Sequence, residues 1–188
     1  MTGELRLVWP AEEYLPAYVD ALQRGWSPDN VRPQAAIEEE LEKIARDPAG
    51  FVRGLVDREG RGSPVTLPDG STVPRLPGYR KWMWDGEFCG SVGLRWQPGT
   101  STLPAHVLGH TGYAVVPWKR GRGYATRALA LILNDARAEG LEYVEIVTTP
   151  DNVASQRVAL ANGAVLVERF TKTPHYGSEE GLRYRIGI

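Results

Sequence analysis

A short glycine-containing segment at 115–126 has the residue types and spacing best suited to hold a phosphate group. An apolar run ends there at Pro117, basic residues surround Gly121 and Gly123, and a helical pattern follows. Because glycine lets the backbone turn sharply, several N–H groups can point at one anion. The following helix would add its unpaired N–H groups and the positive end of its dipole. The segment therefore predicts a cradle for the diphosphate of a ligand.

Two common phosphate loops do not fit this segment. A nucleoside-triphosphatase loop has the form G-x-x-x-x-G-K-[ST], which occurs nowhere in the sequence. A dinucleotide loop has a third glycine, and this chain has Thr126 at that position. A dinucleotide loop is also followed by a strand that ends in an acidic residue, and the corresponding strand of this chain ends in Thr148. The string that remains is Arg120-x-x-Gly123-x-Ala125.

This string resembles the R/Q-x-x-G-x-G/A coenzyme A motif of the GNAT superfamily of acyl-CoA N-acyltransferases. Further along, 152–163 fits the GNAT pattern N-x-x-S-x-x-V-x-x-x-x-G, and the resemblance as a whole covers roughly 82–188. It implies that acetyl-CoA is the cosubstrate and that no metal is needed. The coenzyme contacts that it implies are Val115, Arg120, Gly121, Arg122, Gly123, Tyr124, Ala125, Thr126, Asn152 and Ser155.

The elements around the loop follow from the spacing of apolar residues. Helical spacing runs over 122–139, and Gly140 is a suitable stop. Alternation over 141–148 predicts a strand, and a second helix begins after Asn152 and ends at Asn162-Gly163, before a last hairpin. The resulting order is strand, glycine loop, helix and strand.

The first half of the chain predicts two helices, around 14–22 and 37–44, with a turn between them. Strands over 80–84 and 87–96 are joined by a tight turn at Asp85-Gly86, and a third strand at 110–116 leads into the glycine loop.

Between these helices and strands, the composition of 57–78 predicts a long excursion with a small hairpin at Pro68-Asp69-Gly70. Two interpretations of it stay open, a cover over a site and a mobile surface insertion.

The resemblance implies an α/β (α+β) fold, in which a mixed, mostly antiparallel central sheet is flanked by helices. In that fold the strand at 110–116 splays from the next strand. Its free backbone groups, at Val115 by position, then pair with the pantetheine arm, since buried N–H and C=O groups need partners. With 188 residues, of which 42% are hydrophobic, the chain suits a single domain over 1–188, with a coenzyme-binding half at 109–188 after a first part at 1–108.

A thioester is already activated, so the protein chiefly has to hold a neutral amine against its carbonyl group. A base or a water chain must first take the proton of the ammonium form. Many GNAT enzymes place a glutamate for this on the strand before the coenzyme loop, where this chain has His110. An imidazole with a pKa of roughly 6.5 suits that task. The alternative is a histidine that forms structural hydrogen bonds near the start of the strand.

The usual general acid of the family is a tyrosine, at the position of Ala159 in this chain. Tyr113 and Tyr124 are nearby in sequence, but each could serve only in packing. Water could protonate the thiolate, or the thiolate could leave unassisted, because a thiol pKa of about 8.5 makes it a fair leaving group. Two of the implied coenzyme contacts also have a structural interpretation. Asn152 could cap the helix that follows it, and Ser155 could be a solvated residue of the first turn.

The composition of the chain limits the classes of partner that it is expected to bind. A net charge of −1 gives no overall attraction to nucleic acid or to an anionic membrane, and no apolar run is long enough to span a bilayer. The N-terminal residues lack the features of a signal peptide, so a cytoplasmic location is expected. Cys89 is the single cysteine, which leaves no intrachain disulfide, and no metal-ligand spacing is seen. Trp82 and Trp84 share one strand face and suit core packing better than base stacking.

Three functions are consistent with these features. The leading one is an N-acyltransferase that moves an acetyl group from acetyl-CoA to a primary amine of a small molecule or a protein, by direct attack on the thioester. The second is a catalytically silent acyl-CoA-binding sensor, which Ala159 permits, and the third, a nucleotide-binding oxidoreductase, is disfavoured by Thr126. The acceptor is expected near 26–32, 57–78 and the hairpin around His175 and Tyr176, and homodimer formation is left open.

Overall fold

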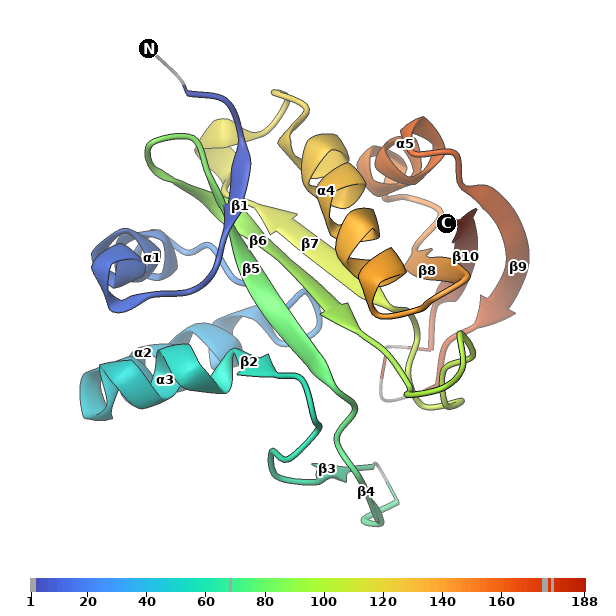
Figure 1. Cartoon of the computed structure of the whole chain (residues 1–188), viewed down its shortest axis with the longest axis horizontal. Coiled ribbons are helices and arrows are strands. Elements are labelled where there is room, and N and C mark those ends of the chain that lie inside the picture. Colours follow the sequence, from blue (N-terminus) through green and yellow to red (C-terminus); the bar gives the residue numbers. More distant parts are fainter. Residues whose placement is uncertain (1–2, 68, 174–175, 177) are drawn as a thin grey trace.

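The computed structural model describes residues 3–67, 69–173, 176 and 178–188, and its strands form two larger antiparallel sheets and a small hairpin (Figure 1). The first sheet has the order β1 (Arg6–Val8), β5 (Gly78–Trp84), β6 (Phe88–Arg95), β7 (Thr111–Val115), and β2 (Val56–Asp57) also pairs with β5. The second has the order β8 (Tyr143–Thr148), β10 (Glu180–Gly187), β9 (Val165–Thr171). The helices are α1 (Leu15–Gln23), α2 (Pro33–Arg46), α3 (Pro48–Gly54), α4 (Tyr124–Ala138) and α5 (Val153–Ala161), with short 3-10 turns η1 (Glu12–Tyr14) and η2 (Pro117–Lys119).

Helices cover the first sheet on both faces, which gives the molecule two apolar cores. Figure 1 shows α1, α2 and α3 on one side of this sheet and α4 and α5 on the other. Alternation along β5 serves both cores, since Tyr79 and Met83 pack toward α4, whereas Trp82 and Trp84 pack toward α1 and α2. The two tryptophans thus pack in the core, as the sequence predicts.

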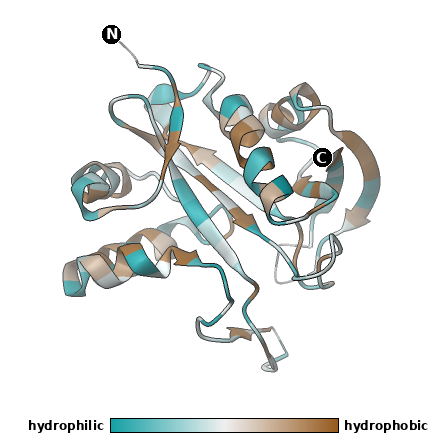
Figure 2. Ribbon diagram, in the orientation of Figure 1, coloured by the Kyte–Doolittle hydropathy of each residue, from teal (hydrophilic) through white to brown (hydrophobic). Residues whose placement is uncertain are grey.

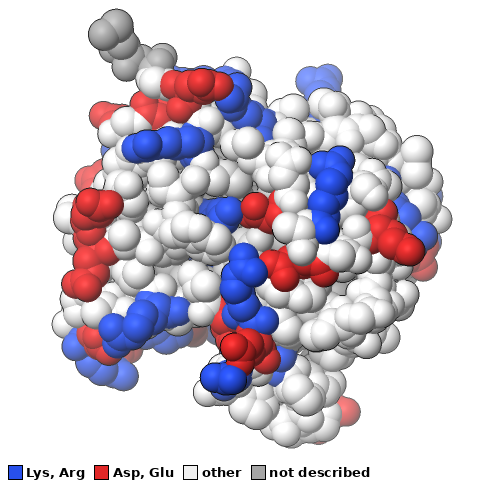
Figure 3. All heavy atoms as spheres, in the orientation of Figure 1, with Lys and Arg blue, Asp and Glu red and all other residues white. Residues whose placement is uncertain are grey.

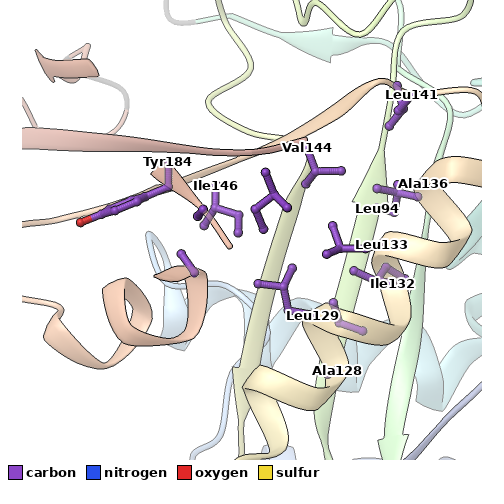
Figure 4. Close-up of a cluster of buried hydrophobic side chains, with 14 of the residues drawn as sticks. Leu94, Ala128, Leu129, Ile132, Leu133, Ala136, Leu141, Val144, Ile146 and Tyr184 are labelled. Atoms are coloured by element: carbon purple, nitrogen blue, oxygen red, sulfur yellow. The ribbon is translucent and has the colours of Figure 1, made fainter. Parts of the chain in front are cut away.

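Helix α4 turns one apolar face toward both sheets (Figure 4), and Figure 2 shows its hydrophobic and hydrophilic residues on different sides. This face consists of Ala128, Leu129, Ile132, Leu133 and Ala136, all buried. Burying one leucine or isoleucine side chain of this kind stabilises the fold by about 2 kcal/mol. The packing therefore fixes the helix, and with it the position of the loop that precedes its first residue.

The predicted turns and helix ends are confirmed where local chemistry decides them. Gly86, in the turn between β5 and β6, has a φ of 112°, and Gly140 and Gly163, which follow α4 and α5, have φ of 82° and 81°. Only glycine adopts such angles without strain. Short elements were not predicted, namely β1, β2 and α3, which begins at Pro48 after the Asp47 cap.

The excursion at 57–78 forms a two-stranded hairpin of its own, β3 (Val65–Thr66) with β4 (Thr72–Val73). Leu67 and Ser71 close its turn by a backbone hydrogen bond, which agrees with the predicted hairpin, although Pro68 lies outside the described residues. Figure 1 shows this hairpin projecting from the body of the molecule.

The two larger sheets meet at the start of β7. The backbone N–H of His110 donates to the carbonyl oxygen of Glu145 in β8 at 2.9 Å, but the described strands β7 and β8 form no continuous ladder. Gly109 allows this close approach, since a Cβ there would lie 2.9 Å from the same carbonyl oxygen. Beyond this contact the facing edge of β7 is open, which is the splayed strand pair that the resemblance implies.

Candidate active site

The glycine loop lies between the end of β7 and the first turn of α4. Gly121 and Gly123 have φ of 75° and 74°, and a Cβ built on either would meet no atom within 4 Å. The backbone N–H groups of 121–126 donate to no acceptor among the residues that the structure describes. A row of unpaired donors at a helix N-terminus, beside open space, is an arrangement that suits a diphosphate.

Asp85 holds this loop in place from the neighbouring turn. Its carboxylate accepts hydrogen bonds from the ammonium group of Lys119 at 2.6 Å and from the hydroxyl of Tyr124 at 2.5 Å. Lys119 lies before the two glycines and Tyr124 after them, so one buried side chain fixes both ends of the loop. Sequence reasoning assigned Asp85 only to the hairpin turn. No local signal links it to residues 34 and 39 positions away.

The electrostatics of this cluster favour its charged form. Burial would raise the pKa of Asp85, but the hydrogen bonds from Lys119 and Tyr124 outweigh it and lower that pKa to about 2. Burial would likewise lower the pKa of Lys119, yet its contacts with Asp85 and Glu87 raise it to about 12. Both groups are therefore ionised at neutral pH. Cys89 lies beside them, fully buried, and desolvation together with Asp85 raises the pKa of its thiol to about 12.

The open edge of β7 presents backbone groups toward the loop. The N–H of Val116 donates to the carbonyl oxygen of Cys89 in β6 at 3.0 Å, so the groups of Val115 face away from β6, by the alternation of an antiparallel pair. The carbonyl oxygen of Val115 accepts a hydrogen bond from the Nε of Arg120 at 3.2 Å. Two of the predicted coenzyme contacts thus lie side by side.

His110 is fully buried between the two sheets. Its Nδ1 accepts a hydrogen bond from the N–H of Glu145 at 2.9 Å, so Nε2 carries the proton and donates to the carbonyl oxygen of Ser101 at 3.1 Å. Burial lowers the pKa of His110, although the charge of Glu145 acts in the opposite direction. The neutral ring is therefore favoured. A general base must reach the proton of its substrate, and these contacts leave the ring neither exposure nor a free lone pair.

The first turn of α5 faces β7 across the splayed region. Asn152 caps the helix by accepting from the N–H of Ser155 at 3.1 Å, as its structural alternative predicts. The hydroxyl groups of Tyr113 and Ser155 are 3.0 Å apart, and burial raises the pKa of Tyr113. Ala159 is fully buried one helical turn further on. Tyr124, the other tyrosine that the sequence singled out, already donates to Asp85.

The remaining predictions concern partners and the acceptor region. The part of the chain that the structure describes holds no group of three or more metal-ligating side chains, and none of its helices has the length and hydropathy of a membrane span. Acidic and basic side chains are interspersed on the face shown in Figure 3.

In the predicted acceptor region His175 lies outside the described residues, and the hydroxyl of Tyr176 donates to the carbonyl oxygen of His106 at 3.1 Å. Trp118 packs against the guanidinium of Arg24, 3.4 Å from its ring centre.

Comparison with known proteins agrees with this geometry. Residues 70–165 match the family described as "Acetyltransferase (GNAT) domain". The structure is similar to the microcin C7 self-immunity acetyltransferase MccE, solved with acetyl-CoA and AMP (TM-score 0.65, 15% identity, covering 100% of this chain and 97% of that one). It is also similar to RimL, a ribosomal L7/L12 alpha-N-protein acetyltransferase solved with coenzyme A (TM-score 0.65, 17% identity, 98% and 94%). A further similar structure is Mycobacterium smegmatis RimJ with a CoA-disulfide (TM-score 0.62, 18% identity, 100% and 83%).

Comparison of the sequence with curated proteins gives no significant match. The structural neighbours share less than a quarter of their residues with this chain, so their likeness concerns the fold. The match over 70–165 covers more than half of the 188 residues and includes β7, the glycine loop, α4 and α5. With its splayed strands and its glycine loop, the chain belongs to the GNAT acetyltransferase family.

Proposed function

We propose that this protein is an N-acetyltransferase that moves the acetyl group of acetyl-CoA to a primary amine. The observation that carries the proposal is the row of unpaired backbone N–H groups at 121–126, beside two glycines whose Cβ positions are open. A diphosphate would accept from these donors, and the basic residues Arg120 and Arg122 add attraction.

The edge of β7 fits the peptide-like arm of the coenzyme. The N–H and C=O of Val115 face away from β6, and an extended arm with amide groups pairs with such an edge as an added strand would. Arg120 would release the Val115 carbonyl oxygen and turn to the phosphates. Asn152 and Ser155 stand at the far side of the splay, where they would contact the same arm.

Bound acetyl-CoA supplies an activated thioester. The amine nitrogen forms a bond to the acetyl carbon, the carbon–sulfur bond breaks, and the thiolate leaves with the electron pair. The protein holds these groups together by its loop and by β7. We assign the removal of the amine proton to water, because His110 uses both ring nitrogens in the core. The hydroxyl pair of Tyr113 and Ser155, whose oxygens lie 3.0 Å apart, is our candidate for donating a hydrogen bond to the leaving thiolate, which then takes its proton from water.

The test measures binding and turnover separately. Calorimetry with CoA, acetyl-CoA and NAD is expected to show binding of the first two only. Thiol release from acetyl-CoA is then followed with a panel of primary amines. Binding of acetyl-CoA without release for any amine would favour the sensor function. Absence of CoA binding would overturn the assignment of the loop.

A further inference from the structure

The face of the first sheet that looks toward α1, α2 and α3 is open at one position of β7, Gly112, whereas Ala114 on the same face packs against the core. Gly112 is exposed, and a Cβ built on it would meet no atom within 4 Å. Its partner across the ladder is Gly93 in β6, so two adjacent positions lack side chains. The opposite face of β7 is different, since Tyr113 and Val115 pack there against the core under α4. An amine can thus approach the edge of β7 from the glycine face.

Two arginines project from the same face beside these glycines. Arg80 in β5 pairs across the ladder with Gly93, and Arg95 in β6 pairs with Gly78, so the two arginines are diagonal neighbours. Diagonal neighbours in an antiparallel pair lie about 7–8 Å apart at their Cα atoms, within reach of such long side chains.

The two arginines differ in their partners. Arg80 donates to the carboxylate of Glu40 in α2 at 2.9 Å and to the hydroxyl of Tyr18 in α1 at 3.1 Å. Arg95 is exposed, and no carboxylate of the described residues lies within ion-pair distance of it.

Arg80 already has Glu40 as its carboxylate partner, whereas the exposed guanidinium of Arg95 has none among the described residues and is available to bind an anion. A guanidinium offers two parallel N–H donors that match a carboxylate or a phosphate. Arg95 is two residues along β6 from Gly93, about 7 Å by the rise of a strand. A ligand that spans this distance places its anionic group at Arg95 and its amine over Gly112.

We propose that the acceptor of this acetyltransferase is an amine that also carries a carboxylate or phosphate group, which Arg95 binds beside the uncovered Gly112. The proposal rests on the proposed function and names the class of its second substrate. It assigns Arg95 to acceptor recognition and leaves coenzyme binding to the loop at 121–126.

The experiment uses protein saturated with CoA, so that the glycine loop is occupied and cannot bind the probes. Calorimetry then measures O-phosphoethanolamine against ethanolamine, and 4-aminobutyrate against butylamine, in wild type, Arg95→Gln and Arg95→Lys. Arg157→Gln is the matched control, because Arg157 is an exposed arginine of α5 that forms no ion pair with a described residue. The same pairs are compared as acceptors by thiol release, with acetyl-CoA in place of CoA. Unchanged thermal unfolding shows that each variant is folded.

We expect at least one anionic amine to bind wild type at least tenfold more tightly than its neutral counterpart, and Arg95→Gln to lose that preference. Arg95→Lys should keep part of it and Arg157→Gln all of it. The phosphate and carboxylate pairs show which anion is preferred. Equal binding of anionic and neutral amines by wild type, or a preference that survives in Arg95→Gln, would overturn the proposal even where transfer is seen. Failure of CoA to bind would instead overturn the proposed function.

Discussion

The imidazole of His110 illustrates how one residue joins the two sheets. It accepts from the backbone of Glu145 in β8 and donates to the backbone of Ser101 in the loop before β7. Removing the ring would leave both backbone groups buried and unpaired, and each such group costs about 1–3 kcal/mol. The sequence predicts His110 to be a general base, with a structural histidine as the alternative, and these two roles predict different consequences of mutation.

We expect His110→Ala to lower the free energy of unfolding by about 2–4 kcal/mol, from the unpaired groups and the cavity. At a temperature where the variant stays folded, kcat/KM should fall less than about tenfold, because both ring nitrogens are bonded to backbone groups and the proposed mechanism gives the amine proton to water. Urea unfolding and thiol-release kinetics measure the two effects. A loss of 10²-fold to 10⁴-fold in rate with unchanged stability is the result expected of a general base, and it would contradict a structural role.

The pH dependence of stability provides an independent test of His110. Burial lowers its pKa, so below about pH 6.5 the unfolded chain binds a proton that the folded ring does not. Its contribution to stability is therefore complete above that pH and is lost as the pH falls toward the folded pKa, by at most about 1.4 kcal/mol per pH unit. Urea unfolding between pH 8 and 5 should show this decline in wild type. His110→Gln keeps a donor and an acceptor but has no titrating ring, so the decline should be smaller.

Gly123 tests the loop at the scale of one residue. Its φ of 74° strains any side chain, and a β-branched residue would also fill the open space beside the unpaired N–H groups. We expect Gly123→Val to abolish CoA binding in calorimetry while the protein stays folded. Gly140→Val is the control, since Gly140 has a similar φ of 82° and equally open surroundings but lies at the other end of α4. Unchanged affinity in Gly123→Val would refute the cradle.

At the scale of elements, the turn between β5 and β6 supports the loop between β7 and α4 through Asp85. The carboxylate of Asp85 is paired with a buried ammonium group, so neutralising it leaves that charge without its main partner. We expect Asp85→Asn to lower the free energy of unfolding by about 2–4 kcal/mol and to weaken CoA binding at least tenfold. Glu87→Gln is the control. Glu87 contacts the same Lys119 but its side chain is 78% exposed, so its loss should cost under about 1 kcal/mol.

The pH range of this effect follows from the lowered pKa of Asp85. Its stabilising contribution is complete above the unfolded value of about 3.8 and is lost as the pH falls to about 2. At neutral pH the difference between wild type and Asp85→Asn should thus be independent of pH. If the difference in the free energy of unfolding between wild type and Asp85→Asn vanished near pH 6, a group other than Asp85 would have to be responsible for it.

These elements also show which parts of the structure a sequence reveals. The glycine loop, α4, α5 and the hairpin of β5 and β6 were predicted because glycines, caps and apolar spacing act within a few residues. Strands β1 and β2 are two or three residues long and carry too little pattern to detect. The roles of Asp85 and of the ring nitrogens of His110 depend on partners elsewhere in the chain, 39 and 35 residues away for Tyr124 and Glu145. The spacing of residues within one element does not predict contacts between residues so far apart in the sequence.

At the scale of the whole molecule, the hairpin of β3 and β4 stands apart from both cores. Neither core includes a described residue of 58–78, and no hydrogen bond or ion pair of the described residues joins β3 or β4 to the glycine loop. The observed placement favours a surface insertion.

We expect replacement of residues 65–73 by a short Gly-Ser linker to change the free energy of unfolding by less than about 1 kcal/mol, because shortening an exposed loop alters closure entropy only slightly. CoA affinity should be unchanged in calorimetry. The acceptor assay decides between the two interpretations, since a selective rise in the KM of the amine would show that the hairpin covers the acceptor.

The burial of Cys89 has a practical consequence for measuring this enzyme. Its thiol is fully buried, and a pKa of about 12 leaves it protonated at any ordinary working pH. Aromatic disulfide reagents react with accessible thiolates, so we expect that Cys89 of the folded protein does not react with them. Every colour change in a continuous assay then reports coenzyme A set free by turnover. In denaturant the same reagent would titrate one thiol per chain, which makes it a built-in count of unfolded molecules.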